Sequence, residues 1–245
     1  MTLLQAFRPA AGLCLLMCFR LIPTSLLLAA VLASACSESR EPPTAPAAAQ
    51  TVPVVVALGD SLTAGQGVAP DESYPSLVQA RARSANYPHR VINAGVSGDT
   101  SADVLRRLDG ALHPDARVLI LAAGANDGLQ GIPVAQIRSN LSTIIERAQG
   151  RGIRVLLCGM ETLPTHGLDY SLDFHRVFPD LAARYQVALM PFLLEGVLGD
   201  PALNQPDRIH PNAAGYRRIA ANIWPYLEPI LRATSTNQLD RVNPR

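Results

Sequence analysis

This 245-residue chain lacks lysine, has almost no net charge and contains few cysteines. Each of these features excludes a class of chemistry. The chain contains no lysine, so its 21 basic residues are all arginine. This excludes a phosphate-loop lysine, a Schiff-base lysine and a serine–lysine dyad. The 21 basic residues are offset by 20 acidic ones. The composition therefore does not suggest binding to nucleic acid or attraction to an anionic membrane surface.

Cysteine is scarce as well, with four residues in the chain. Three of them, Cys14, Cys18 and Cys36, lie among the first 36 residues, which leaves Cys158 alone in the body of the chain. No disulfide can therefore form within that body. Because Cys158 ends an apolar run, we expect it to act as a small buried hydrophobic residue rather than as a nucleophile.

The N-terminal 36 residues have the layout of a bacterial export signal. The apolar run 26–32 follows two arginines and is followed by Ala33-Ser34-Ala35-Cys36. Cleavage after Ala35 by ordinary signal peptidase competes with lipid attachment at Cys36, and we favour the lipoprotein. An uncleaved membrane anchor is the weaker alternative because the apolar run is short. We thus expect an exported protein, either periplasmic or attached to a membrane through lipidated Cys36.

The rest of the chain is expected to be a tether, one domain and a short tail. Residues 37–52 are rich in proline and alanine and are typical of a tether. Residues 53–233 are expected to form the domain, and residues 234–245 the tail. In the domain, strand-like runs (54–58, 90–93, 118–122, 154–159, 187–191) alternate with helical stretches (74–84, 102–112, 134–149, 172–184, 213–231). This alternation predicts a parallel sheet with helices on both faces.

Four short motifs occur in a fixed order: GDSL at 59–62, NAG at 93–95, GAND at 124–127 and DRIH at 207–210. The first three follow strand-like runs, so their loops should meet at one edge of a parallel sheet. The four motifs together supply a nucleophile, oxyanion donors, a base and an orienting carboxylate. This set predicts a serine hydrolase.

Ser61, His210 and Asp207 are the predicted catalytic residues. A serine hydroxyl is a weak nucleophile until an imidazole accepts its proton, and a carboxylate must hold that imidazole in the correct tautomer. The spacing of Asp207 and His210 places both on one turn. The alternatives are that Ser61 caps a helix or belongs to a glycine-rich phosphate loop of a flavodoxin-like protein, and that Asp207 and His210 only cap the following helix.

The same edge should also hold donors for a negatively charged oxygen. Asn126 offers a side-chain amide, and Gly95 offers a backbone N–H where a Cβ would crowd the substrate. The alternatives are a loop cap for Asn126 and a turn glycine for Gly95. Asp60, Asp99 and Asp127 lack ligand spacing with histidine or cysteine, so we expect loop-shaping hydrogen bonds and no metal.

These residues are similar to a known family, the GDSL-type SGNH hydrolases, from about Val54 to Leu231. The resemblance rests on ALGDSL at 57–62, NAGVSGDTS at 93–101, GANDGL at 124–129 and IHPN at 209–212. Its nearest branch is that of bacterial arylesterases and multifunctional thioesterase I/lysophospholipases. The resemblance implies a three-layer α/β/α sandwich with a five-stranded parallel sheet and flavodoxin-like topology.

The resemblance also implies roles and a substrate class. Ser61 is the implied nucleophile, His210 the base and Asp207 its orienting partner, with the N–H groups of Ser61 and Gly95 and the amide of Asn126 forming the oxyanion hole. The implied substrates are small-molecule or lipid esters, including aryl and short- to medium-chain acyl esters, thioesters and lysophospholipids. No cofactor is implied.

Two positions depart from the family pattern and bear on the substrate. Thr165-His166-Gly167 stands where relatives often have Asn-Tyr-Gly, and we expect His166 to contact substrate. Arg208 stands where glycine is common, and we expect it to engage an anionic leaving group. Two other functions compete with the esterase: a carbohydrate O-acetylesterase on the same fold, and a catalytically silent envelope lipoprotein or flavin-binding module.

Overall fold

The computed structural model describes residues 51–242. The predicted export signal, the lipidation site Cys36 and nearly all of the tether lie outside the described residues. Residues 48–245 fall into one compact unit. Within the described part of that unit, every helix is too short or too polar to cross a membrane.

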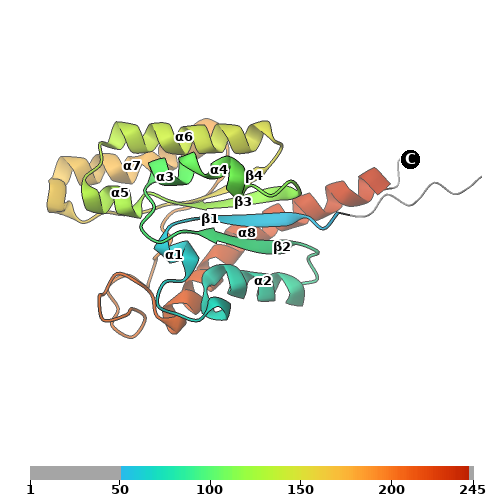
Figure 1. The fold of residues 1–245 in the computed structure, drawn as a ribbon, viewed down its shortest axis with the longest axis horizontal. Coiled ribbons are helices and arrows are strands. Elements are labelled where there is room, and N and C mark those ends of the chain that lie inside the picture. Colours follow the sequence, from blue (N-terminus) through green and yellow to red (C-terminus); the bar gives the residue numbers. More distant parts are fainter. Residues whose placement is uncertain (1–50, 243–245) are drawn as a thin grey trace, which may run out of the picture. The chain divides into compact units, whose positions relative to one another are not determined.

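A five-stranded, all-parallel sheet forms the centre of the domain (Figure 1). Its strands are β1 (Val54–Gly59), β2 (Arg90–Gly95), β3 (Ala116–Ala122), β4 (Arg154–Cys158) and β5 (Ala188–Met190). Their order across the sheet is β2-β1-β3-β4-β5. All of β1 and nearly all of β3 and β4 are buried, as expected for apolar strands covered on both faces. Cys158 is fully buried, and burial raises the pKa of its thiol to about 12.

Helices cover both faces of the sheet, which confirms the predicted three-layer sandwich. Figure 1 shows α2 and α8 on one face, and α3, α4, α6 and α7 on the other. The helices are α1 (Ser61–Ala64), α2 (Tyr74–Ser84), α3 (Ser101–Arg106), α4 (Leu108–Ala111), α5 (Ala125–Gln130), α6 (Val134–Gly150), α7 (Leu168–Tyr185) and α8 (Ala213–Val242). Short 3₁₀ turns occupy Pro70–Glu72 and Pro164–His166.

Two helical segments differ from the sequence prediction. The single helix expected over residues 102–112 is broken at Arg107, which separates α3 from α4. The Arg107 guanidinium donates to the carboxylate of Asp99 (2.5 Å) and to the carbonyls of Ala94 and Gly59 (2.8 Å each), so these contacts hold the break in place. The last helix extends to Val242 rather than ending near residue 231, and it includes most of the predicted tail.

The strand order creates a crevice at the carboxyl ends of β1 and β3. The chain passes from β1 to β2 on one side and then returns to pair β3 on the other side of β1. Connections that leave neighbouring strands toward opposite faces open a crevice between them, where ligands bind in open α/β sheets. Gly59 ends β1 there, and a Cβ at Gly59 would lie only 2.2 Å from the carbonyl oxygen of Ala122 on β3.

A buried histidine links the start of β2 to the far part of α8. His89 is 2% exposed, and its Nε2 lies 2.8 Å from Thr234 Oγ1. The Thr234 hydroxyl donates to the carbonyl of Ile230 (2.8 Å), so it accepts a hydrogen bond from a neutral His89 that carries its proton on Nε2. His89 Nδ1 is buried without a partner among the described residues. Burial lowers the pKa of His89 to about 4.

We expect this histidine to make the fold less stable in mild acid. The pKa of His89 is lower in the folded state than in the unfolded state, so the unfolded chain binds the proton first as the pH falls below about 6.5. Between pH 7.5 and pH 5 the free energy of unfolding should drop by about 2 kcal/mol through this residue. Urea unfolding at the two pH values checks this. His89→Gln keeps an N–H for Thr234 and does not titrate, so an equal pH dependence in that variant contradicts the prediction.

Candidate active site

The three predicted catalytic residues form a hydrogen-bonded row. His210 Nε2 lies 3.0 Å from Ser61 Oγ, and His210 Nδ1 lies 2.7 Å from Asp207 Oδ2. The other carboxylate oxygen of Asp207 accepts the backbone N–H groups of Ile209 and His210, both at 2.9 Å. These bonds, led by that from the His210 side chain, lower the pKa of Asp207 to about 2. Asp207 is therefore a carboxylate at any ordinary pH, and it holds the proton of the imidazole on Nδ1.

The turn after β1 aims Ser61 at this histidine. Asp60 is fully buried and caps α1, since its Oδ1 accepts the N–H of Leu62 at 3.0 Å. Burial raises the pKa of Asp60 to about 7, against the lowering effect of the Leu62 bond. Gly65 ends this one-turn helix at a φ of 83°. Ser61 is thus the first residue of α1, and its N–H is among the groups that have no intrahelical partner.

Asn126 enters the site from the opposite side of the crevice, at the start of α5. One hydrogen of its side-chain amide is donated to the carbonyl of Asp99 at 2.9 Å. The second amide hydrogen remains for a ligand. The next residue, Asp127, is fully buried and accepts the backbone N–H (2.7 Å) and hydroxyl (2.5 Å) of Ser101. The predicted loop-shaping role of Asp60, Asp99 and Asp127 is confirmed.

The prediction that Gly95 offers a free donor is wrong. Its N–H is donated to the side-chain oxygen of Asn93 at 2.9 Å, and both residues belong to the last three positions of β2. A Cβ at Gly95 would instead meet the backbone of Ala64 at 2.2 Å, so glycine is required there for close packing of α1 on β2. The NAG motif thus indicated the correct region of the sheet edge but the wrong glycine for the oxyanion donor.

Gly98, three residues after Gly95, has the free backbone N–H that was expected of Gly95. Its φ is +88°, and no acceptor for its N–H occurs within the described residues. It directly precedes Asp99, whose carbonyl is bonded to Asn126, so the loop holds Gly98 beside the amide of Asn126. Sequence reasoning missed this residue, although Ser97-Gly98-Asp99 is a turn signal that could have indicated it.

A cavity of about 400 Å³ opens beside these groups. Ser61, Asn126 and His210 lie in its wall together with Arg208, and most of the remaining wall is apolar. The apolar contributors are Leu62, Leu129, Met160, Leu163, Phe192, Leu194, Leu198 and Ile209. The volume is within the range of small-molecule sites, and an apolar wall with a few converging polar groups is typical of them.

His166 does not line this cavity. Its Nε2 lies 3.1 Å from the carbonyl of Leu129, and its ring packs edge-on against Tyr170, 5.4 Å between centroids. The ring also fills the space beside Gly131, where a Cβ would approach it to 2.8 Å. The prediction of His166 as a substrate contact is therefore not supported by its position, which is that of a spacer between α5 and α7.

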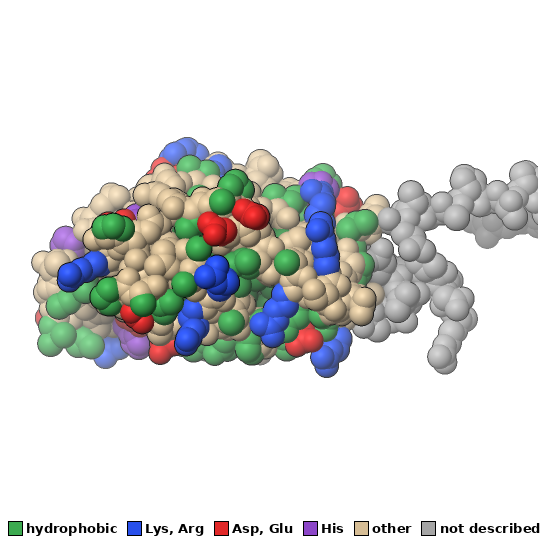
Figure 2. All heavy atoms as spheres, turned by 90° about the horizontal axis from the view of Figure 1, so that it is seen from below, with side chains coloured by type: hydrophobic (Ala, Val, Ile, Leu, Met, Phe, Trp, Pro, Cys, Tyr) green, Lys and Arg blue, Asp and Glu red, His purple; other side chains and the backbone are tan. Residues whose placement is uncertain are grey.

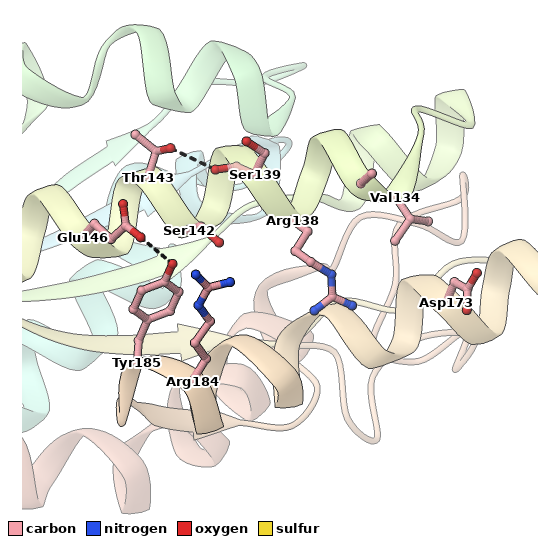
Figure 3. Close-up of a pocket in the computed structure, with 10 residues that line it drawn as sticks. Val134, Arg138, Ser139, Ser142, Thr143, Glu146, Asp173, Arg184 and Tyr185 are labelled. Carbon is pink, nitrogen blue, oxygen red and sulfur yellow. Dashed lines mark hydrogen bonds between the residues drawn. The ribbon is translucent and has the colours of Figure 1, made fainter.

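A larger hollow of about 660 Å³ lies elsewhere, between α6 and α7 (Figure 3). Its wall is polar and exposed, with Arg138 paired to Asp180 (3.0 Å) and Tyr185 donating to Glu146 (2.5 Å). The residues of its wall include serine and threonine hydroxyls but no histidine that could activate them. Size alone therefore does not locate the chemistry, and the smaller cavity with the Ser61–His210–Asp207 row is the candidate active site.

A family model described as the GDSL-like lipase/acylhydrolase family matches residues 57–218. The chain belongs to this family. The match spans the first three motifs and the catalytic turn, so the resemblance stated from the motifs is confirmed.

Family members of known name and structure are similar over most of the domain. The esterase TesA of Pseudomonas aeruginosa is 41% identical over 186 residues, which are 76% of this chain and 91% of that protein. The thioesterase 1/protease 1/lysophospholipase L1 of Escherichia coli is 33% identical, over 73% of this chain and 85% of its own. The crystal structure of AlinE4, an SGNH-hydrolase family esterase, is 39% identical and covers 80% of this chain and 98% of its own, with a TM-score of 0.62.

Proposed function

We propose that this GDSL-family protein is a serine esterase that cleaves carboxylic esters of short- to medium-chain acids through an acyl-enzyme on Ser61. The observation that carries the proposal is the row Ser61 Oγ, His210 Nε2, His210 Nδ1, Asp207 Oδ2, with contacts of 3.0 and 2.7 Å. The names of the relatives support it, since they include an esterase and a thioesterase/lysophospholipase.

The first half of the reaction acylates the serine. The Ser61 hydroxyl passes its proton to His210 Nε2 while Oγ forms a bond to the carbonyl carbon. The resulting oxyanion accepts hydrogen bonds from the N–H groups of Ser61 and Gly98 and from the free amide hydrogen of Asn126. Asp207 stabilises the imidazolium without itself taking the proton. The bond to the alcohol oxygen then breaks, and the imidazolium gives its proton to the departing alcohol.

Water completes the cycle by the same groups. His210 takes a proton from water, the oxygen of that water bonds to the acyl carbon, and the bond to Ser61 Oγ breaks as Oγ regains the proton. The products are the acid and free Ser61. The mostly apolar cavity wall suits an unbranched acyl chain, which supports acyl esters over acetylated sugars.

The test is hydrolysis of a nitrophenyl ester series from acetyl to palmitoyl by the purified protein, combined with a phosphonate ester that phosphonylates activated serines. We expect turnover to be greatest for short to medium chains and the phosphonyl group to be found on Ser61 by peptide mass spectrometry. Turnover of acetyl esters alone favours an O-acetylesterase. Absence of both turnover and labelling contradicts the esterase and favours the catalytically silent protein.

Export and lipid attachment at Cys36 are also proposed, from the sequence of residues 1–36 alone. Under this proposal the domain acts outside the cytoplasm of a bacterium, held by the proline- and alanine-rich tether. The mass of the mature N-terminus checks it, since unmodified Cys36 or a start at Ser37 contradicts the lipoprotein.

A further inference from the structure

We propose that Arg208 selects esters whose alcohol part carries an anionic group, a phosphate or a carboxylate. The inference rests on the proposed esterase function and adds the substrate class to it. Four observations carry it: the backbone conformation of Arg208, its lack of an ion partner, its place in the cavity wall and its distance along the chain from His210.

The backbone of Arg208 is in a conformation that arginine does not favour. Its φ is +60°, in the left-handed region, where a residue with a Cβ is sterically strained and glycine is not. The chain has two other non-glycine residues of this kind among its described positions, Asn86 and Gln186. Gln186 caps α7 and Asn86 follows the end of α2, where left-handed residues commonly end helices. Arg208 ends no helix; its N–H is donated to the carbonyl of Gln205 at 2.9 Å, which closes a turn that glycine would adopt with less strain than arginine.

The guanidinium of Arg208 is the unpaired charge of the cavity. The other charged residue of the wall, Glu161, accepts a hydrogen bond from His175 Nδ1 at 2.6 Å. The neighbouring Asp207 is engaged by His210. Within residues 51–242 the Arg208 side chain has neither a hydrogen bond nor an ion pair. Arg208 thus brings five unpaired N–H donors to a cavity wall that is otherwise mostly apolar.

The remaining wall shows which part of an ester would carry the anion. Leucines form an exposed rim around the cavity, with Leu129 50%, Leu163 60% and Leu198 44% exposed. Hydrophobic side chains also gather at the left end of the face drawn in Figure 2, the end at which the strands finish in Figure 1. An aliphatic acyl chain fits this rim and carries no charge. The anion must then belong to the alcohol.

The position of Arg208 agrees with that assignment. Arg208 precedes His210 by two residues, and His210 is the group that protonates the departing alcohol. A guanidinium binds phosphate or carboxylate through two parallel hydrogen bonds. An anion on the alcohol therefore lies within reach of Arg208 while its ester oxygen faces His210.

The test compares two esters that share an octanoyl chain and differ in the charge of the alcohol. 4-Octanoyloxybenzoate has an anionic leaving group, and 4-octanoyloxybenzamide is its neutral, nearly isosteric counterpart. The measured quantity is the ratio of kcat/KM for the anionic ester to kcat/KM for the neutral one. A second pair, octanoyl glycerol 3-phosphate and octanoyl glycerol, asks the same question for phosphate.

The variants separate charge from backbone strain. Arg208→Gln should lower the ratio about five- to tenfold in at least one pair, mainly through a higher KM for the anionic ester. Arg208→Lys should retain most of the ratio, because it keeps the charge. Arg208→Gly, which removes both strain and charge, should behave like Arg208→Gln. Arg83→Gln, an exposed change of equal charge on α2, is the matched control and should leave the ratio unchanged.

Salt gives an independent check, because attraction between exposed charges is screened at high ionic strength. In the wild type the ratio should fall toward the Arg208→Gln value as sodium chloride is raised. An equal ratio in wild type and Arg208→Gln for both pairs overturns the inference, as does an equal fall in Arg83→Gln. In either case hydrolysis of the neutral esters leaves the esterase proposal standing, whereas loss of all hydrolysis in every protein refutes the esterase itself.

Discussion

Ser61→Ala is expected to reduce ester turnover by about 10⁴- to 10⁶-fold, the largest effect of any single substitution in this chain. The variant removes the oxygen that forms the acyl-enzyme and leaves His210 without a proton to accept. The Ser61 hydroxyl has one side-chain contact, the 3.0 Å bond to His210 Nε2. Alanine is also a good helix former at the start of α1. We therefore expect a folded but inactive protein.

The measurement is kcat for nitrophenyl butyrate, with the thermal midpoint and circular dichroism as checks of folding. Ser139→Ala is the matched control, because Ser139 lies on the exposed side of α6 in the hollow of Figure 3, away from the catalytic cavity. It should retain wild-type turnover. A Ser61→Ala protein that still acts within tenfold of the wild type shows that another group is the nucleophile, and the acyl-enzyme mechanism is then wrong.

Asp207→Asn is expected to lower kcat by about 10³- to 10⁴-fold with little change in KM. The asparagine oxygen can still accept the N–H groups of Ile209 and His210, so the turn should keep its shape. Its amide nitrogen, however, replaces the oxygen that now accepts from His210 Nδ1 at 2.7 Å. The imidazole then carries its proton on Nε2, where it cannot accept the proton of Ser61.

The pH dependence sharpens this prediction. The hydrogen bond from His210 lowers the pKa of Asp207 to about 2, so wild-type activity should not be lost through protonation of Asp207 above about pH 4. Raising the pH should not rescue Asp207→Asn, because an amide does not titrate. Asp200→Asn is the control, since Asp200 likewise accepts a backbone N–H, that of Ala202, in the same long loop. A loss smaller than tenfold in Asp207→Asn means that the carboxylate is not needed to orient His210.

Much of the fold followed from periodicity and composition. The apolar runs 54–58, 118–122 and 154–159 became the buried strands β1, β3 and β4, because strands covered on both faces have no polar side. The helix predicted over 102–112 broke at Arg107 instead. That break depends on carbonyl groups of Gly59 and Ala94, which are far away in sequence and are invisible to local propensity.

The residues of the site were predictable to different degrees. Ser61, Asp207 and His210 were identified because nucleophilic catalysis needs these residue types, and Asp207 and His210 needed only a shared turn to meet. The oxyanion glycine was not identified correctly. The two candidate glycines, Gly95 and Gly98, differ in the folded chain: Gly95 packs against Ala64 and donates its N–H to Asn93, whereas Gly98 has a φ of +88° and a free N–H.

Chemical identity and strand pattern, which are local properties, were thus determined by the sequence alone: a parallel α/β sandwich, a serine with its histidine and aspartate, and a loop that holds an oxyanion donor. Tertiary structure decided which N–H groups remain free, that His166 packs on Gly131 rather than lining the cavity, and that Arg208 adopts a left-handed backbone without an ion partner. Each of these depends on which groups the folded chain brings into contact, and composition and periodicity do not determine those contacts.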